Sequence, residues 1–181
     1  MTATTPTTGT LTYTIDPAHS RAHFAIRHLA IAHVRGEFTA LSGTATHNSA
    51  DASALEVNAT IDAASYFSGN PQRDEHVKGE HFLDVAKYPT ITFVSKQANG
   101  QQVTGDLTLH GVTKEVILHV VETSQEITDP WGNRRFGVTA TTQIKRSDFG
   151  IDFNAPMEGG GFMLSDEVAV TLDLQLIRKP E

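Results

Sequence analysis

Residues 167–176 read EVAVTLDLQL, and this stretch decides the fold. Its larger apolar side chains occupy every second position from Val168 through Leu172 to Leu176, and Thr171 and Asp173 stand between them. Such alternation is typical of a β-strand, because successive side chains of a strand point to opposite faces of the sheet. We therefore expect a strand whose apolar row points into the protein and whose Thr171 and Asp173 point outward.

The same alternation recurs along most of the chain. It is clear in residues 55–61, 103–109 and 136–144, and weaker in residues 11–16, 22–28, 34–46, 90–95 and 112–121. Turn-forming pairs such as Asn99-Gly100 and His110-Gly111 separate several of these runs, and residues 129–133 form a longer hairpin tip. Consecutive strands of this kind predict an all-β fold of eight or so strands. We expect an antiparallel meander that closes into an extended, lipocalin-like barrel without exposed edges.

One segment departs from the period of two. Asn70 can cap a helix, Pro71 suits its first turn, and Asp74 and Glu75 favour the positive end of the helix dipole. We therefore predict one α-helix from residue 71 to about Asp84, outside the main run of strands. Residues 1–10 are expected to form a flexible tail, and residues 11–179 a single domain.

The composition excludes several classes of function. The chain has 181 residues, a net charge of -7 and no cysteine. Thiolate nucleophiles, zinc fingers and iron–sulfur clusters are therefore excluded, and the scattered basic residues are poorly suited to binding nucleic acid. No run of about 20 apolar residues could span a bilayer. The first residues lack the basic start and apolar core of a secretory signal. We therefore expect a cytoplasmic protein, the alternative being that the sequence is a processed or engineered form.

Nine histidines raise the question of a metal site, but their spacing does not fit one. His76 and His81 are five residues apart, which places them on different faces of a helix, and no HExxH motif occurs. Nucleophile-elbow, P-loop and dinucleotide-binding motifs do not occur either. We therefore predict no catalytic residue and no metal ligand. The alternative is an enzyme that uses a histidine inside the barrel as a general base on a bound lipid.

A barrel of eight strands either fills its interior with side chains or holds one small ligand. Small residues on the inward rows favour a ligand because they could leave space, and these residues are Ala22, Gly36, Ala40, Ala59 and Ala140. Residues 147–165 are rich in apolar side chains but contain three consecutive glycines and no strand period. This segment is either a lid over a ligand or a plug of the barrel end.

The inward parity of each strand predicts the wall of such a cavity. His28 shares the parity of Phe24 and Ile26, so its ring should face the interior. There it either binds the polar head of a ligand or is satisfied by a backbone carbonyl or a buried water. The predicted ligand contacts are Phe24, Ile26, His28, Phe38, Val57, Phe93, Phe136, Val138, Phe149, Phe153, Phe162 and Leu172.

Seven segments between Tyr13 and Ile177 form an ordered series. They are YTIDPAHSRAHFAIRHL, VRGEF, RDEHVKGEHFLDVAKYPTITFVS, VTGDLTLHGVTKEV, DPWGNRRFG, KRSDFGIDFN and DEVAVTLDLQLI. In this order they resemble the YceI-like family of lipocalin-like, polyisoprenoid-binding proteins. The resemblance implies an extended antiparallel barrel with one helix outside the strands.

The resemblance also implies a ligand and a role. The barrel interior would hold one long amphiphilic lipid, such as an isoprenoid quinone or a prenyl phosphate, for storage or transport. The expected partner is thus a small-molecule lipid, with no nucleic acid, no transmembrane segment and no cofactor besides that lipid, and a homodimer remains open. Exported relatives exist in the family, whereas this chain shows no export signal.

Overall fold

The alternating stretch around Leu172 lies in the longest strand of the protein, β12. A computed structural model describes residues 9–48 and 51–180 of the chain. The described residues form the following elements: β1 (Thr10–Ile15), β2 (Arg21–His28), β3 (Ala32–Phe38), β4 (Leu41–Asn48), β5 (Asp51–Asp62), a 3-10 helix (Ala63–Ser65), β6 (Tyr66–Phe67), α1 (Pro71–Lys78), β7 (Thr90–Ala98), β8 (Gln102–Leu109), β9 (Val112–Thr123), β10 (Ile127–Thr128), β11 (Arg134–Lys145), a second 3-10 helix (Arg146–Phe149) and β12 (Leu164–Arg178). The predicted tail, residues 1–10, lies mostly outside the described residues, and its last residue, Thr10, begins β1.

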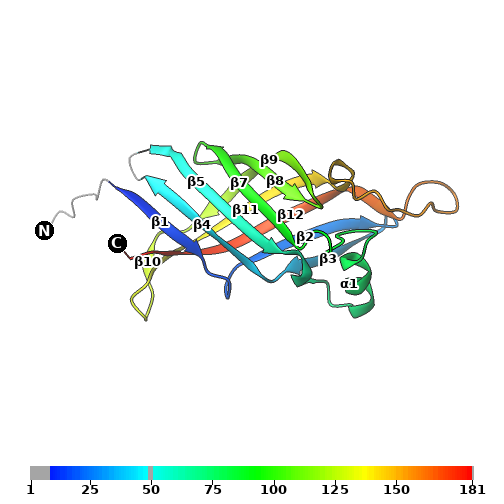
Figure 1. The fold of residues 1–181 in the computed structure, drawn as a ribbon, viewed down its shortest axis with the longest axis horizontal. Helices are drawn as coiled ribbons and strands as arrows, with labels where there is room; N and C mark the ends of the chain where they lie inside the picture. The colour runs from blue at the N-terminus through cyan, green and yellow to red at the C-terminus, as the bar shows by residue number, and fades with distance from the viewer. Residues whose placement is uncertain (1–8, 49–50, 181) are drawn as a thin grey trace, which may run out of the picture.

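The strand β12 closes the sheet into a barrel (Figure 1). One edge of β12 pairs with β11, and the other edge pairs first with β2 and then, near the C-terminus, with β1. All of these pairs are antiparallel, and β4, β5, β7, β8 and β9 complete the ring. Because β1 and β2 act as one bent strand, and β3 and β4 as another, the closed barrel has eight strands. The predicted fold class is confirmed.

The single strand predicted over residues 34–46 is wrong, because the chain breaks between β3 and β4 at Thr39 and Ala40. The hydroxyl of Ser65 accepts hydrogen bonds from the amides of Thr39 and Ala40 at 3.2 and 3.1 Å. These two amides therefore leave the strand ladder, and β3 and β4 pair with different partners, β2 and β1. The break depends on Ser65, which is distant in sequence. The alternation of apolar residues over 34–46 therefore could not predict it.

The predicted turns are present. Asn99 and Gly100 join β7 to β8, and the side-chain oxygen of Asn99 accepts two of the following amides at 3.1 and 2.8 Å. His110 and Gly111, with φ of 52° and 73°, form the tight turn between β8 and β9. At the β10–β11 tip, the carboxylate of Asp129 accepts the amides of residues 131 and 133. Each turn thus uses the chemistry that its residues predicted.

The predicted helix begins as expected but ends early. The side-chain oxygen of Asn70 accepts the amide of Arg73 at 3.0 Å, which confirms the cap. The helix α1 ends at Lys78 and not near Asp84, because Gly79 adopts an extended backbone with φ of -74° and ψ of 178°. Glycine is a poor helix former and is common where helices end. Residues 79–88 continue as a series of turns.

The two ends of the barrel differ. One end holds β10, the start of β1 and the end of β12 (Figure 1). Side chains fill the interior there, and the rings of Tyr13 and Phe136 meet edge to face at 5.0 Å. Near this end Arg135 pairs with Asp16 and Asp129, which ties the β1–β2 turn to the β10–β11 hairpin. The helix α1 lies at the opposite end, where the interior is hollow.

Candidate functional site

The barrel interior contains a cavity of about 510 Å³. Its wall consists mainly of inward-pointing side chains of β2, β5, β7, β8, β9 and β12, and α1 and residues 151–155 complete it. On β12 the wall residues are Val168, Val170, Leu172 and Leu174, which is the row that the sequence predicted to face inward. The cavity therefore forms because alternate side chains of each strand point inward and the ring of strands is wide enough to leave space between them.

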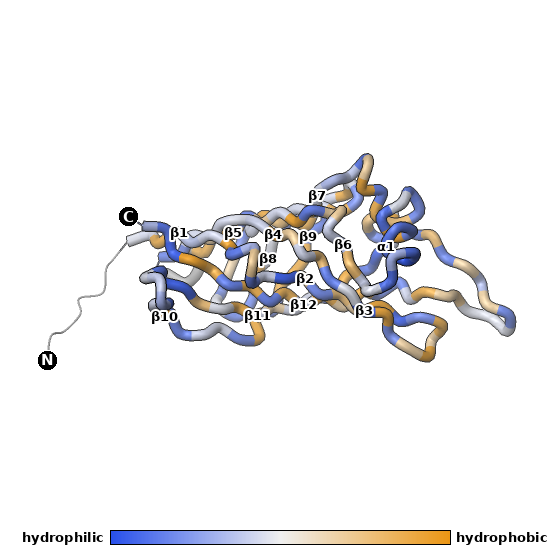
Figure 2. The backbone as a smooth tube through the Cα atoms, turned by 90° about the horizontal axis from the view of Figure 1, so that it is seen from below, coloured by the Kyte–Doolittle hydropathy of each residue, from blue (hydrophilic) through white to orange (hydrophobic). Residues whose placement is uncertain are grey.

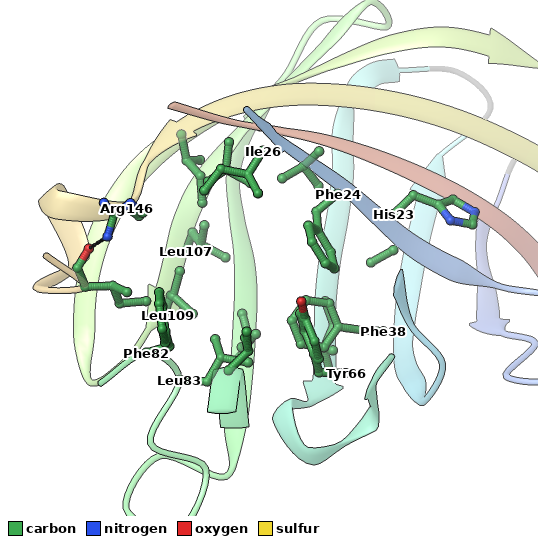
Figure 3. Close-up of a pocket in the computed structure, with 18 of the residues that line it drawn as sticks. His23, Phe24, Ile26, Phe38, Tyr66, Phe82, Leu83, Leu107, Leu109 and Arg146 are labelled. Atoms are coloured by element: carbon green, nitrogen blue, oxygen red, sulfur yellow. Dashed lines mark hydrogen bonds between the residues drawn. The ribbon is translucent and has the colours of Figure 1, made fainter. Parts of the chain in front are cut away.

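Eight of the twelve predicted contacts lie on the cavity wall, and they are Phe24, Ile26, His28, Phe38, Val57, Phe93, Phe153 and Leu172. Phe24 stacks on Tyr66 with 5.1 Å between the ring centroids, and Phe38 packs edge-on against the same ring. Figure 3 shows this aromatic group on one side of the pocket and Leu107 and Leu109 on the other. The side with the leucines also carries Phe82, so both sides of the cavity are apolar.

The structure places Phe136 and Val138 elsewhere than predicted. Both pack in the core cluster around Tyr13 and Leu176, at the filled end of the barrel. Their inward parity was predicted correctly, but parity reports only the face of the sheet. Their position along the barrel axis depends on pairing with distant strands.

Phe149 and Phe162 also lie away from the cavity wall, on either side of the three glycines. Phe149 is only 1% exposed and packs in the core with Leu109 and Ile151. Phe162 is exposed to solvent. The segment therefore differs along its length. Its first residues are packed core, whereas Phe153 and Met163 border the cavity and are themselves partly exposed.

His28 lies on the cavity wall, as its parity predicted. It ends β2, where it pairs with Leu164 of β12, and it is half-buried. Within the described part of the chain its ring has no protein hydrogen-bond partner, so the predicted satisfaction by a backbone carbonyl is not seen. Its nitrogens remain available to a ligand or to water.

Arg146 is a buried cavity residue that the sequence reasoning missed. Its guanidinium donates to the carbonyls of Ser165 at 3.0 Å, Ile151 at 2.9 Å and Phe153 at 2.7 Å. Figure 3 shows Arg146 at the edge of the pocket. Burial lowers the pKa of Arg146, and the carboxylate of Asp166 opposes that shift. A signal existed, because Arg146 continues the inward parity of residues 136–144. Arg146 lies between the strand predicted over residues 136–144 and the apolar segment predicted over residues 147–165, and neither prediction included it.

The cavity carries no negative charge of its own. None of the described residues on its wall is Asp or Glu, whereas Arg146, Arg73 and His76 lie there beside His28. Arg73 is held by Ser68, whose hydroxyl and carbonyl accept its Nε and Nη2 at 2.7 and 2.9 Å. The described side chains of the cavity wall are therefore either uncharged or positively charged.

In 9–48 and 51–180, no three or more His, Asp and Glu side chains are grouped so that they could hold a metal ion. None of the helices in these ranges has the length and apolarity needed to cross a membrane.

Known proteins are similar in sequence to this chain. Residues 13–176 match the YceI-like domain. A UPF0312 protein of Pseudomonas savastanoi pv. phaseolicola is 38% identical over 151 residues, which are 80% of this chain and 78% of that protein. A UPF0312 protein of Staphylococcus aureus is 35% identical over 156 residues, which are 86% of this chain and 91% of that protein.

Solved structures share the fold. BcnA of Burkholderia cenocepacia superimposes with a TM-score of 0.70 at 26% identity, over 89% of this chain and 98% of that one. A polyisoprenoid binding domain from Saccharophagus degradans, implicated in plant cell wall breakdown, gives a TM-score of 0.67 at 20% identity, over 93% of this chain and 99% of that one. This second likeness supports the fold. Because the sequence match runs from β1 to β12 and so covers the whole barrel, the chain belongs to the YceI-like family.

Proposed function

We propose that the cavity binds one long amphiphilic lipid, of the isoprenoid quinone or prenyl phosphate type, which the protein stores or transports. The apolar cavity of about 510 Å³ carries this proposal. Small-molecule sites typically measure about 300–1,000 Å³ and are mostly apolar. Burying a hydrocarbon tail against such a wall stabilises the complex by about 25 cal/mol per Å². The family resemblance supports an isoprenoid tail.

The polar groups of the wall favour a head group that carries acceptor oxygens. His28 pairs with Leu164, and Arg146 donates to the carbonyl of the next residue, Ser165, so both lie beside the start of β12. Both residues line the cavity, and no acidic side chain of the described wall competes with a ligand oxygen. A quinone carbonyl or a phosphate could accept hydrogen bonds there.

The setting of His28 supports binding over general-base catalysis. A catalytic base is usually oriented and tuned by a second group, often a carboxylate. In the described residues no carboxylate contacts the His28 ring, and no acidic side chain lines the cavity. Storage or transport of an unchanged lipid is therefore the function that this geometry favours.

Organic extraction of the purified protein, followed by mass spectrometry, tests the function. We expect a near-stoichiometric lipid with a long apolar tail, which is recovered with unchanged mass after incubation with the protein. Turnover of the added lipid would favour the enzyme instead. Failure both to extract a lipid and to bind an added isoprenoid quinone or prenyl phosphate would overturn the proposal.

The substitution His28→Phe tests the polar end of the site. The fold should persist, because ring volume is roughly kept and a desolvated polar group is removed. Affinity for a head-grouped lipid should fall about tenfold, which corresponds to one lost hydrogen bond, while affinity for a hydrocarbon of equal length stays the same. His119→Phe, at an exposed position outside the barrel, is the matched control. Equal losses for both ligands, or no loss for either, would make His28 a structural residue.

A further inference from the structure

The tip of the β2–β3 hairpin carries residues that are unusual for its backbone conformation. Leu29 and Ala30 adopt left-handed backbone, with φ of 53° and 57°, and the amide of Ile31 bonds to the carbonyl of His28 at 3.2 Å. Tight hairpin turns of this kind normally use Asn and Gly, since left-handed backbone is unfavourable for side chains such as Leu and Ala. Ile31 is moreover 80% exposed. Apolar residues placed at an exposed, strained tip indicate a functional constraint.

A second apolar loop lies against this tip. The carbonyl of Met163 accepts the amide of Leu29 at 2.7 Å, so the end of the 150–163 segment adjoins the hairpin. Phe162 is 63% exposed, and Met163 is also partly exposed. We call the half-buried Leu29 and the exposed Ile31, Phe162 and Met163 the apolar rim. Figure 2 shows hydrophobic colour at the turn of the β2–β3 hairpin, beyond β3. Contiguous exposed apolar side chains usually mark an interaction surface.

The rim borders the entrance of the lipid cavity. Met163 belongs both to the rim and to the cavity wall, and His28 and Leu164 lie on the wall directly beside it. Phe153 and His76 are also exposed wall residues at this end. The opposite end of the barrel is filled by side chains. A lipid that enters or leaves at the hollow end therefore passes the apolar rim.

Charge at the hairpin is opposite to that of the whole protein. Residues 27–36, which include the hairpin tip, contain two arginines and two histidines and no acidic residue, whereas the chain carries a net charge of -7. Arg27 and Arg35 are exposed on the strands that carry the tip, and Arg27 braces the tip by donating twice to the carbonyl of Ala30, at 3.1 and 2.7 Å. The neighbouring 150–163 segment contains two acidic residues, Asp152 and Glu158. A basic, apolar projection on an acidic protein complements an anionic bilayer surface.

We propose that the hollow end of the barrel docks on anionic lipid membranes. The apolar rim enters the boundary between head groups and acyl chains, and Arg27 and Arg35 contact the lipid phosphates. The inference rests on the proposed function, because docking at the cavity entrance lets a lipid pass between bilayer and barrel without crossing water. The membrane is a partner distinct from the single lipid inside the cavity.

Vesicle sedimentation with the full chain tests the docking. The protein should sediment with vesicles of about three parts phosphatidylcholine to one part phosphatidylglycerol, less with pure phosphatidylcholine, and less at high salt. The double variant Ile31→Ser/Phe162→Ser should bind at least about tenfold more weakly. The matched control is Trp131→Ser/Ile127→Ser. These side chains are 81% and 60% exposed at the β10–β11 end and are expected to leave binding unchanged.

A charge variant and an extraction complete the test. Arg35→Gln should weaken binding to the anionic vesicles and leave binding to phosphatidylcholine alone unchanged. Wild-type protein that stays in the supernatant with both vesicles would overturn the docking, as would a control double variant that loses as much binding as the rim variant. Extraction of bound lipid separates the two proposals. A rim variant that fails to dock should still hold its lipid, whereas an empty cavity in a protein that docks would contradict the proposed function alone.

Discussion

The substitution Leu172→Asp should unfold the barrel or empty its cavity. Leu172 lies on the inward row of β12, where its neighbours across the two adjacent strands are Ala22 and Ala140. Both alanines are buried and offer no polar side chain to a carboxylate. An uncompensated buried charge typically destabilises a protein by about 3 to 5 kcal/mol, which is a large part of the stability of one domain. Urea unfolding and lipid extraction measure the two effects.

The neighbouring residue supplies the matched control. Thr171 points outward between His23 and Thr141, and the next outward residue, Asp173, is already a carboxylate that lies 3.4 Å from His23. Thr171→Asp should therefore change the free energy of unfolding by less than about 0.5 kcal/mol. If Leu172→Asp keeps both its stability and its lipid, the inward register of β12 is wrong.

The sequence predicted the barrel well because strand alternation is a local property. The row from Val168 to Leu174 reports which face of β12 is buried without reference to any other strand. The turn at Asn99-Gly100 and the helix cap at Asn70 are equally local, and the structure confirms both. The identity of the fold and most of the cavity wall follow from such local signals.

Position along the barrel axis could not be predicted in the same way. Phe136 and Val138 share the inward parity of β11, yet they pack at the filled end because β11 pairs there with the last residues of β12. The break at Thr39 likewise depends on Ser65, which lies 26 residues later. Both features arise from contacts between distant segments, and a single sequence does not specify these contacts.

Space inside the barrel was also harder to predict than its walls. Small inward residues were expected to leave room, and Ala22 and Ala59 do line the cavity. Gly36, in contrast, seats a ring of the adjacent strand, because a Cβ there would lie 2.6 Å from Cζ of Phe24. Ala40 falls in the break between β3 and β4 and is exposed. A small residue therefore makes space only where no neighbouring side chain fills it.

Arg146→Met should destabilise the protein by about 3 kcal/mol and release the segment that follows it. Arg146 donates hydrogen bonds to the carbonyls of Ile151, Phe153 and Ser165. Replacing a buried charge by an apolar residue can be neutral when its partners are replaced as well. Here the partners are backbone carbonyls, which remain in place and lose their donors. Hydrogen exchange over residues 147–165 should accelerate, and urea should unfold the variant at lower concentration.

Two further variants test whether stability requires the guanidinium of Arg146, which can donate hydrogen bonds in several directions. Arg146→Lys keeps the charge, but a single ammonium cannot reach three carbonyls in different directions, so it should recover only part of the lost stability. Arg134→Met removes an exposed arginine that is paired with Glu126, and it should cost less than about 1 kcal/mol. If Arg146→Met is as stable as the wild type and its exchange rates are unchanged, Arg146 does not hold the segment. The border of the cavity formed by Phe153 and Met163 would then be fixed by apolar packing alone.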